Sequence, residues 1–159
     1  HITINSNWAS NTDGAYGYYD DNTTNRDTYG MLYNWYAVDN SSGLCPQGWH
    51  VPSNSEFSEL VAELGSNPAA KLKETGTTHW TSESVGTSNS SGFTALPAGH
   101  RNVTNGTYIQ LSTHTYFWSS NYYSSSKAKF RYLIHNSSSI FDPVNNRKNY
   151  GFSVRCLKD

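Results

Sequence analysis

The chain has 159 residues, enough for one domain and too few for two well-cored ones. Ser, Asn and Thr make up 55 residues, and charged residues only 14%, where about 25% is usual. These three residue types compete for backbone hydrogen bonds, so long helices and a coiled coil are not expected. No apolar run approaches the length of a membrane span. The net charge of −1 excludes a basic domain that coats nucleic acid.

Aromatic residues are unusually frequent. Leu, Ile, Val and Phe number only 27, a low share that by itself indicates disorder. However, the chain also holds 12 Tyr, 6 Phe and 5 Trp, and disordered chains are poor in aromatics. The composition therefore predicts a folded domain with a core of aromatic rings and a polar, mostly uncharged surface.

The net charge hides an uneven distribution. Residues 1–115 hold ten acids and four bases, which gives −6, and residues 116–159 hold two acids and seven bases, which gives +5. Such asymmetry can mark an interaction face; the alternative is an ordinary solvated surface.

The two cysteines, Cys45 and Cys156, are far apart and have no neighbouring partner. This spacing disfavours a zinc site or thioredoxin-type chemistry. Two buried thiols or one long-range disulfide remain open, and the disulfide would require an oxidising compartment.

In chain order, residues 1–28 are expected to be loop with one short strand at Ile2–Ile4. Residues 31–38 are aromatic and β-branched and predict a strand; residues 44–52 form a connector with two prolines. Ser53 and Glu56 then form a capping box for a helix that carries one apolar stripe and stops at Gly65.

A shorter helix is expected from Pro68 to about Glu74, and short strands follow. Asn105-Gly106 predicts a two-residue hairpin turn between residues 101–104 and 107–111. Further strands are expected at residues 92–97, 116–120, 129–134, 139–141 and 152–157. The predicted fold class is α+β, with one or two helices and a mostly antiparallel sheet with long loops.

Motifs of known chemistry are missing. The sequence has no phosphate-binding loop, no nucleophile elbow and no zinc-protease motif. The histidines show no ligand spacing, and His50 is expected to form structural hydrogen bonds. Glu56, Glu59 and Glu63 are expected on the solvated face of the first helix. No cofactor, no metal and no catalytic residue is predicted.

Several strings of the sequence are distinctive. They are Gly30-Met-Leu-Tyr-Asn-Trp-Tyr-Ala-Val38, Leu44-Cys-Pro-Gln-Gly-Trp-His-Val-Pro-Ser53, Lys71-Leu-Lys-Glu-Thr-Gly-Thr-Thr-His-Trp80, Gly92-Phe-Thr-Ala-Leu-Pro97, Trp118-Ser-Ser120 and Gly151-Phe-Ser-Val-Arg-Cys156. In this order they resemble the Fibrobacter succinogenes major paralogous domain family over residues 29–158. The resemblance implies a C-type-lectin-like domain at residues 29–159, on which residues 1–28 pack as a turn-rich segment.

The resemblance also assigns structural roles. It implies a disulfide between Cys45 and Cys156, which match the two cysteine positions of the family. It places the four tryptophans of the matching strings in the core: Trp35, Trp49, Trp80 and Trp118.

Residues 121–149 depart most from the family pattern. Related lectin-like folds serve as the variable proteins of diversity-generating retroelements, and many side chains here are encoded by codons that adenine-directed mutagenesis of an Asn codon can reach. Tyr mixed with Ser, Asn and Arg is also the composition of adaptable binding surfaces. The predicted ligand-binding residues are Asn121, Tyr122, Tyr123, Lys127, Lys129, Arg131, Tyr132, His135, Asn136, Phe141, Asp142, Asn145, Asn146, Arg147 and Asn149.

The expected function is non-enzymatic recognition or adhesion by this surface. The partner would be a protein or glycan on a cell surface, without nucleic acid and without membrane insertion. The location would be extracellular, on a bacterial surface protein, a pilus or a phage virion. Alternatives are a glycan-binding module that needs no calcium, since the lectin calcium motifs are missing, a structural surface domain, and an enzyme of the formylglycine-generating type.

Overall fold

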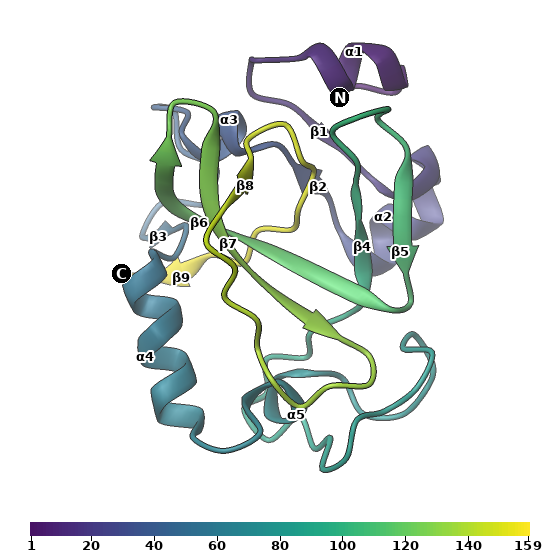
Figure 1. Cartoon of the computed structure of the whole chain (residues 1–159), viewed down its shortest axis with the longest axis vertical. Coiled ribbons are helices and arrows are strands. Elements are labelled where there is room, and N and C mark those ends of the chain that lie inside the picture. The colour runs from purple at the N-terminus through teal and green to yellow at the C-terminus, as the bar shows by residue number, and fades with distance from the viewer.

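A five-stranded sheet crosses the centre of the molecule (Figure 1). The computed structural model describes all residues, 1–159. The sheet order is β5-β4-β6-β7-β8, and every pair is antiparallel except β4 with β6. The strands are β4 (Ala98–Arg101), β5 (Tyr108–Leu111), β6 (His114–Ser124), β7 (Lys127–Ile134) and β8 (Asn146–Arg147).

Two small ribbons accompany this sheet. One pairs β1 (Tyr16–Gly17) with β2 (Leu32–Tyr33), and the other pairs β3 (Trp49–His50) with β9 (Leu157–Lys158). The helices are α1 (Asn5–Ser10), the 3-10 turn η1 (Tyr19–Asp21), α2 (Thr23–Tyr29), α3 (Trp35–Val38), α4 (Asn54–Leu64) and α5 (Pro68–Leu72). The predicted α+β class is confirmed.

Helix α4 begins and ends where the sequence predicts. The Glu56 backbone N–H donates to Ser53 Oγ, and the Ser53 backbone N–H donates to Glu56 Oε2. Both halves of the capping box are therefore formed. Gly65 follows with φ of 64°, a left-handed conformation that glycine adopts readily. Helix α5 begins at Pro68 as expected but ends at Leu72, two residues earlier than predicted.

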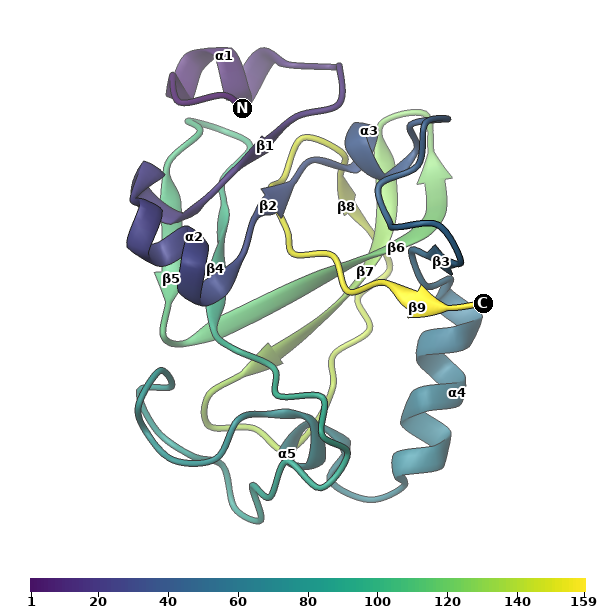
Figure 2. The ribbon, with the colours of Figure 1, turned by 180° about the vertical axis from the view of Figure 1, so that it is seen from behind.

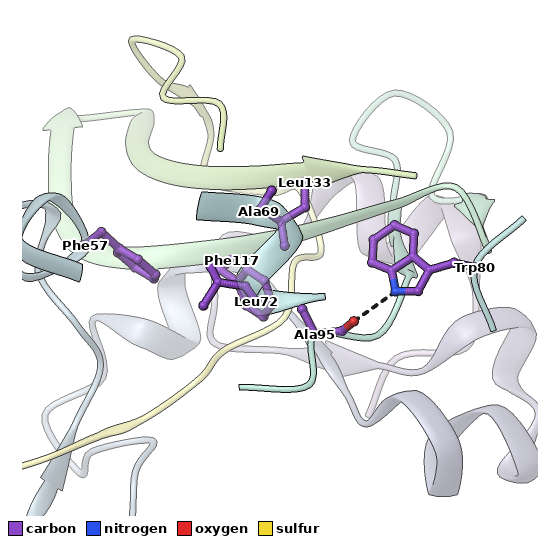
Figure 3. Packing of buried hydrophobic residues seen from close by; sticks show 7 residues of the cluster. All are labelled: Phe57, Ala69, Leu72, Trp80, Ala95, Phe117 and Leu133. Atoms are coloured by element: carbon purple, nitrogen blue, oxygen red, sulfur yellow. Dashed lines mark hydrogen bonds between the residues drawn. The ribbon is translucent and has the colours of Figure 1, made fainter. Parts of the chain in front are cut away.

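The β6–β7 hairpin separates two hydrophobic clusters. Phe117 and Leu133 face α4 and α5, where they pack with Phe57, Leu72 and Trp80 (Figure 3). Trp80 Nε1 donates to the Ala95 carbonyl at 3.0 Å, so its one polar atom is satisfied in the core.

The other face of the hairpin carries the second cluster. Trp118 and Phe130 point to this side because successive strand residues alternate, and they pack with Trp35, Ala128 and Phe152. Phe152 is fully buried, with ring centroids 4.3 Å from Trp118 and 5.0 Å from Phe130. As the composition predicts, aromatic rings carry much of this core.

The tryptophan assignments are right in three of four positions. Trp35, Trp80 and Trp118 are buried, whereas Trp49 is 45% exposed. Trp49 lies on β3, a two-residue edge strand at the surface, so no second layer covers its ring. Trp8, which the sequence did not single out, is buried in the core instead.

Several predicted strands are wrong. Residues 31–38 form only the short strand β2 and then helix α3, because Asn34 caps a helical turn: its side chain accepts from the Ala37 N–H. Residues 92–97 and 139–141 contribute single β-bridges, at Ala95 and Phe141. The expected strand at Ile2–Ile4 is absent.

The predicted hairpin forms with a longer loop. Strands β4 and β5 pair antiparallel, but β4 ends at Arg101 rather than continuing to Thr104. Asn105-Gly106 therefore lies within a six-residue connection, residues 102–107, and not in a two-residue turn.

Residues 1–28 carry α1, β1, η1 and α2, and η1 and α2 cover one side of β4 and β5 (Figure 2). The fully buried Arg101 guanidinium donates to the backbone carbonyls of Ile2 and Thr3. It also lies 4.5 Å from the ring centroid of Trp8. These contacts bind the N-terminal segment closely to the main sheet.

The Cys45–Cys156 disulfide is formed, with 5.8 Å between the Cα atoms. It joins the segment before β3 to the residue before β9, across 111 positions of sequence. His50, on β3, forms its expected structural bonds: its Nδ1 and Nε2 lie 2.6 Å from Asp159 Oδ1 and 2.9 Å from Glu56 Oε1. These two carboxylates raise the pKa of His50.

Candidate functional site

The predicted binding segment does not form one continuous surface. It runs from the end of β6 through β7, along a loop, and back to β8, which pairs with the start of β7 (Figure 1). This pairing brings Arg147 directly opposite Lys127. The two ends of the segment are thus side by side at the tip of the β6–β7 hairpin.

One group of predicted residues is accessible at this tip, and we call it the hairpin-end surface: Tyr122, Tyr123, Lys127, Lys129 and Arg147. Tyr122 is 69% and Tyr123 is 51% exposed. Lys129 Nζ lies 5.3 Å from the centroid of the Tyr123 ring, close enough for a cation–π contact. The surface therefore combines exposed aromatic area with positive charge.

Its positive charge has no internal counterpart. Residues 120–130 and 144–149 contain four bases and no acid, and no salt bridge involves Lys127, Lys129 or Arg147. Like charges directly opposite each other on neighbouring strands, as in Lys127 and Arg147, are destabilising. A negatively charged ligand would relieve this repulsion.

Lys148 adjoins the hairpin-end surface and is not among the predicted binding residues. It is 8% exposed, and its Nζ lies 4.4 Å from the Trp35 ring centroid and 6.0 Å from that of Tyr122. Its carbonyl accepts from the Trp35 N–H, which fixes the backbone here. The charge excess after residue 116 was the only sequence signal for this residue.

Arg131 is an internal residue and not an accessible anchor. It is 4% exposed and its guanidinium donates to Asp142 Oδ1, to Asn54 Oδ1 at 2.7 Å and to Ser58 Oγ. Burial lowers the pKa of this guanidinium, and Asp142 opposes that shift. The reason is strand parity: Arg131 pairs with Phe117 and lies on the face that α4 covers.

Several other predicted residues also have internal partners. Asn121 Oδ1 accepts from the Asn54 N–H at 2.6 Å, at the start of α4. The Tyr132 and Phe141 rings stack with centroids 4.7 Å apart. The Asn149 side-chain amide donates to the Asn11 backbone carbonyl, and the Asn149 backbone carbonyl accepts from Trp8 Nε1.

The remaining predicted residues lie away from the hairpin tip. His135 Nδ1 is 2.7 Å from Ser82 Oγ, at the opposite end of β7 from Lys127. Asn136 is exposed beside it. Asn145 and Asn146 are half-buried on the return to β8.

Metal and thiol chemistry have few candidates here. No group of three or more His, Cys, Asp or Glu side chains is placed to hold a metal ion. Both cysteines are in the disulfide. The Asp142 carboxylate, the one acid of the segment, is paired with Arg131.

The fold and this surface define an α+β, disulfide-containing domain with an exposed aromatic and basic hairpin. The sequence model of the Fibrobacter succinogenes major domain matches residues 1–158, so the chain belongs to this family. The match includes the N-terminal segment. No curated protein and no solved structure matches the chain, so the C-type-lectin-like architecture stays a prediction. None of the helices is long and apolar enough to span a membrane.

Proposed function

We propose that this domain is a non-enzymatic recognition module that binds a negatively charged partner through the hairpin-end surface. One observation carries the proposal: two exposed tyrosines stand among three cations that have no carboxylate partner. Tyr and Arg are the residue types that most often dominate binding energy. Complementary charge accelerates association and selects against wrong partners.

The disulfide indicates the compartment in which the domain would meet its partner. Disulfides persist in oxidising environments, so the domain would act outside the cell, on a bacterial surface protein, a pilus or a phage virion. The partner would be an acidic protein or glycan on a cell surface. An enzyme of the formylglycine-generating type needs a reactive thiol, and both cysteines here are paired.

The first test is a binding array of acidic and neutral glycans and acidic peptides, probed in the presence of EDTA. We expect acidic probes to bind without calcium and their affinity to fall as salt rises. Failure of every acidic probe to bind, or binding of acidic probes only when calcium is added, would contradict the proposal.

The matching variant is the triple substitution Tyr122→Ala, Tyr123→Ala and Arg147→Ala. Hot-spot truncations cost about 2 kcal/mol or more each, so affinity for the acidic probe should fall at least a hundredfold. The control is Trp49→Ala with Lys158→Ala, an exposed aromatic and cation paired on another surface. Equal losses in both proteins would refute the assignment of the site.

Diversification of this segment is a separate part of the proposal. An adenine-substituted near-copy of the codons for residues 116–156, beside a reverse transcriptase gene, would identify it. Variation between copies should then fall on Tyr122, Tyr123 and Lys129 and spare the internal Arg131 and Phe130. Variation spread evenly over these positions would contradict that expectation.

A further inference from the structure

A cavity of about 280 Å³ lies among β4, β5, β6 and β8, apart from the exposed tyrosines. Ligand sites for small molecules are commonly about 300–1,000 Å³, so this one has room for a single ring rather than a large ligand. Its walls come from distant parts of the chain: His100 on β4, Gln110 on β5, Tyr116 on β6 and Asn146 on β8.

The walls carry no net charge. No Lys, Arg, Asp or Glu lines the cavity. Burial lowers the pKa of His100 to about 4, so its imidazole is neutral near pH 7. A bound carboxylate or phosphate would have no cation to pair with, and a bound ammonium would have no carboxylate.

Aromatic rings form one side of the cavity. Phe152 is fully buried and stacks between Tyr116 and Tyr150, with centroid distances of 4.8 and 5.4 Å. The His100 and Tyr116 rings pack in a T-shaped arrangement, with their centroids 4.8 Å apart. Tyr116 and Tyr150 are half-buried and line the cavity, so apolar ring surface is available to a ligand.

Three side-chain amides supply unused donors. Their oxygens are engaged: Gln110 Oε1 accepts from the Tyr116 hydroxyl at 2.7 Å, Asn102 Oδ1 from the Thr104 N–H and Asn146 Oδ1 from the Arg147 N–H. These bonds orient each amide. Their NH₂ groups have no hydrogen-bond partner in the protein, and none is sealed from solvent. They are therefore free to donate to a ligand.

We infer that this cavity binds one ring of a neutral sugar. A pyranose has an apolar face for the aromatic rings and several hydroxyl oxygens for the three amide donors, and it carries no charge. This site is independent of the proposed function of the hairpin-end surface, because it uses different residues and favours an uncharged ligand rather than a negatively charged one.

The test uses methyl glycosides of glucose, galactose, mannose and N-acetylglucosamine, titrated into the whole domain in EDTA and followed by amide chemical shifts. We expect at least one of them to shift residues that line the cavity, including Gln110 and Asn146. Shifts confined to other regions, or none with any of the four glycosides, would overturn the inference. Glucuronate and glucosamine, which carry charge, should bind more weakly.

The decisive variant is Gln110→Met with Asn146→Leu. Each substitution keeps most of the side-chain volume and removes the NH₂ donor, without adding a carboxylate that could accept from a sugar hydroxyl. Loss of two hydrogen bonds should weaken glycoside binding about thirtyfold. The control Asn136→Leu makes the same chemical change at an exposed position outside the cavity and should leave binding unchanged, as should the triple hairpin-end variant. Unchanged affinity in the double variant would also refute the site.

Discussion

Lys73 is buried without any carboxylate partner. It is 1% exposed, and its Nζ donates to Ser84 Oγ and to the carbonyls of Ile134, His135 and Ser137 at 2.8–3.0 Å. Burial lowers its pKa to about 8, and the charge of the Glu83 carboxylate opposes that shift. The four oxygen acceptors also favour the charged form, because only the ammonium has three N–H donors. One side chain thus holds the loop after β7 against the segment after α5.

Replacing this lysine should be costly. Lys73→Met keeps the aliphatic volume but leaves the part-buried carbonyls of His135 and Ser137 without a donor, whereas the Ile134 carbonyl still accepts from the Ser137 N–H. Each unsatisfied group costs about 1–3 kcal/mol. We expect the free energy of unfolding in urea to fall by about 3–5 kcal/mol. Lys71→Met is the control: this lysine lies two residues earlier, is half-buried, and its Nζ donates to one carbonyl, that of Leu64. A loss of unfolding free energy below about 1 kcal/mol in Lys73→Met would show that these hydrogen bonds do not stabilise the fold.

His100 should make stability depend on pH. Its folded pKa of about 4 lies below the ordinary 6.5 because of burial and the nearby His114. Between these values the unfolded chain binds a proton that the folded protein does not, so stability falls as pH drops from 6.5 to about 4. Across this pH range, His100 should lower the free energy of unfolding by about 3 kcal/mol.

His100→Gln removes this titration. The rings packed around the imidazole are those of Tyr116, Tyr150 and Phe152. The nearby His114, whose pKa burial also lowers, is present in both proteins, so the difference between their curves reports His100. Urea unfolding at a series of pH values should therefore show a shallower loss of stability in the variant. Parallel curves for the two proteins would contradict the assignment.

At the scale of elements, α4 was predictable and α3 was not. Ser53, Glu56 and Gly65 form a local pattern whose geometry the helix reproduces. The string at residues 31–38 is aromatic and β-branched like a strand, yet Asn34 accepts from both the Ala15 and the Ala37 N–H groups, and the chain turns into a helix. The bond to Ala15 is a tertiary contact, which local propensity does not encode.

The cap of α4 gives a simple prediction. Ser53→Ala removes the oxygen that accepts from the Glu56 N–H, and loss of an N-cap of this kind costs about 1 kcal/mol. We expect this loss in urea unfolding, with little change for Ser66→Ala, an exposed serine beyond the helix. Equal effects of the two substitutions would mean that the cap contributes nothing.

The predicted binding segment shows how far sequence reasoning reaches at this scale. From composition alone, Lys129 and Arg131, which are two residues apart, are both predicted to contact the ligand. Their surroundings differ because α4 packs over one end of β7 and leaves the hairpin tip uncovered. Strand alternation would predict that about half of the segment faces inward, but not which half.

At the scale of the whole molecule, long-range connections decide the structure. The disulfide was predictable from the family resemblance, whereas the central cavity was not. Its residues, from His100 to Phe152, belong to four strands and to the segments that follow β4 and β8, and no local pattern links them. The close packing of the N-terminal segment through Arg101 was also not visible in the sequence.

Removing the disulfide should weaken the whole fold. A closed loop of this length is worth about 4–5 kcal/mol in the chain-entropy model. Cys45→Ser with Cys156→Ser should lose most of this amount in urea unfolding, and reduction of the unmodified protein should give a similar loss. A double variant as stable as the oxidised protein would show that the bond is not needed for stability.

The central claim is that the hairpin tip is the recognition surface. The most direct measurement is an amide chemical-shift map of the domain with the tightest acidic ligand from the array, in EDTA. The account predicts shifts concentrated at residues 121–129 and 146–148, and their loss in the triple variant. Shifts centred on β3 and β9, or on the loop that carries Asn136, would contradict it.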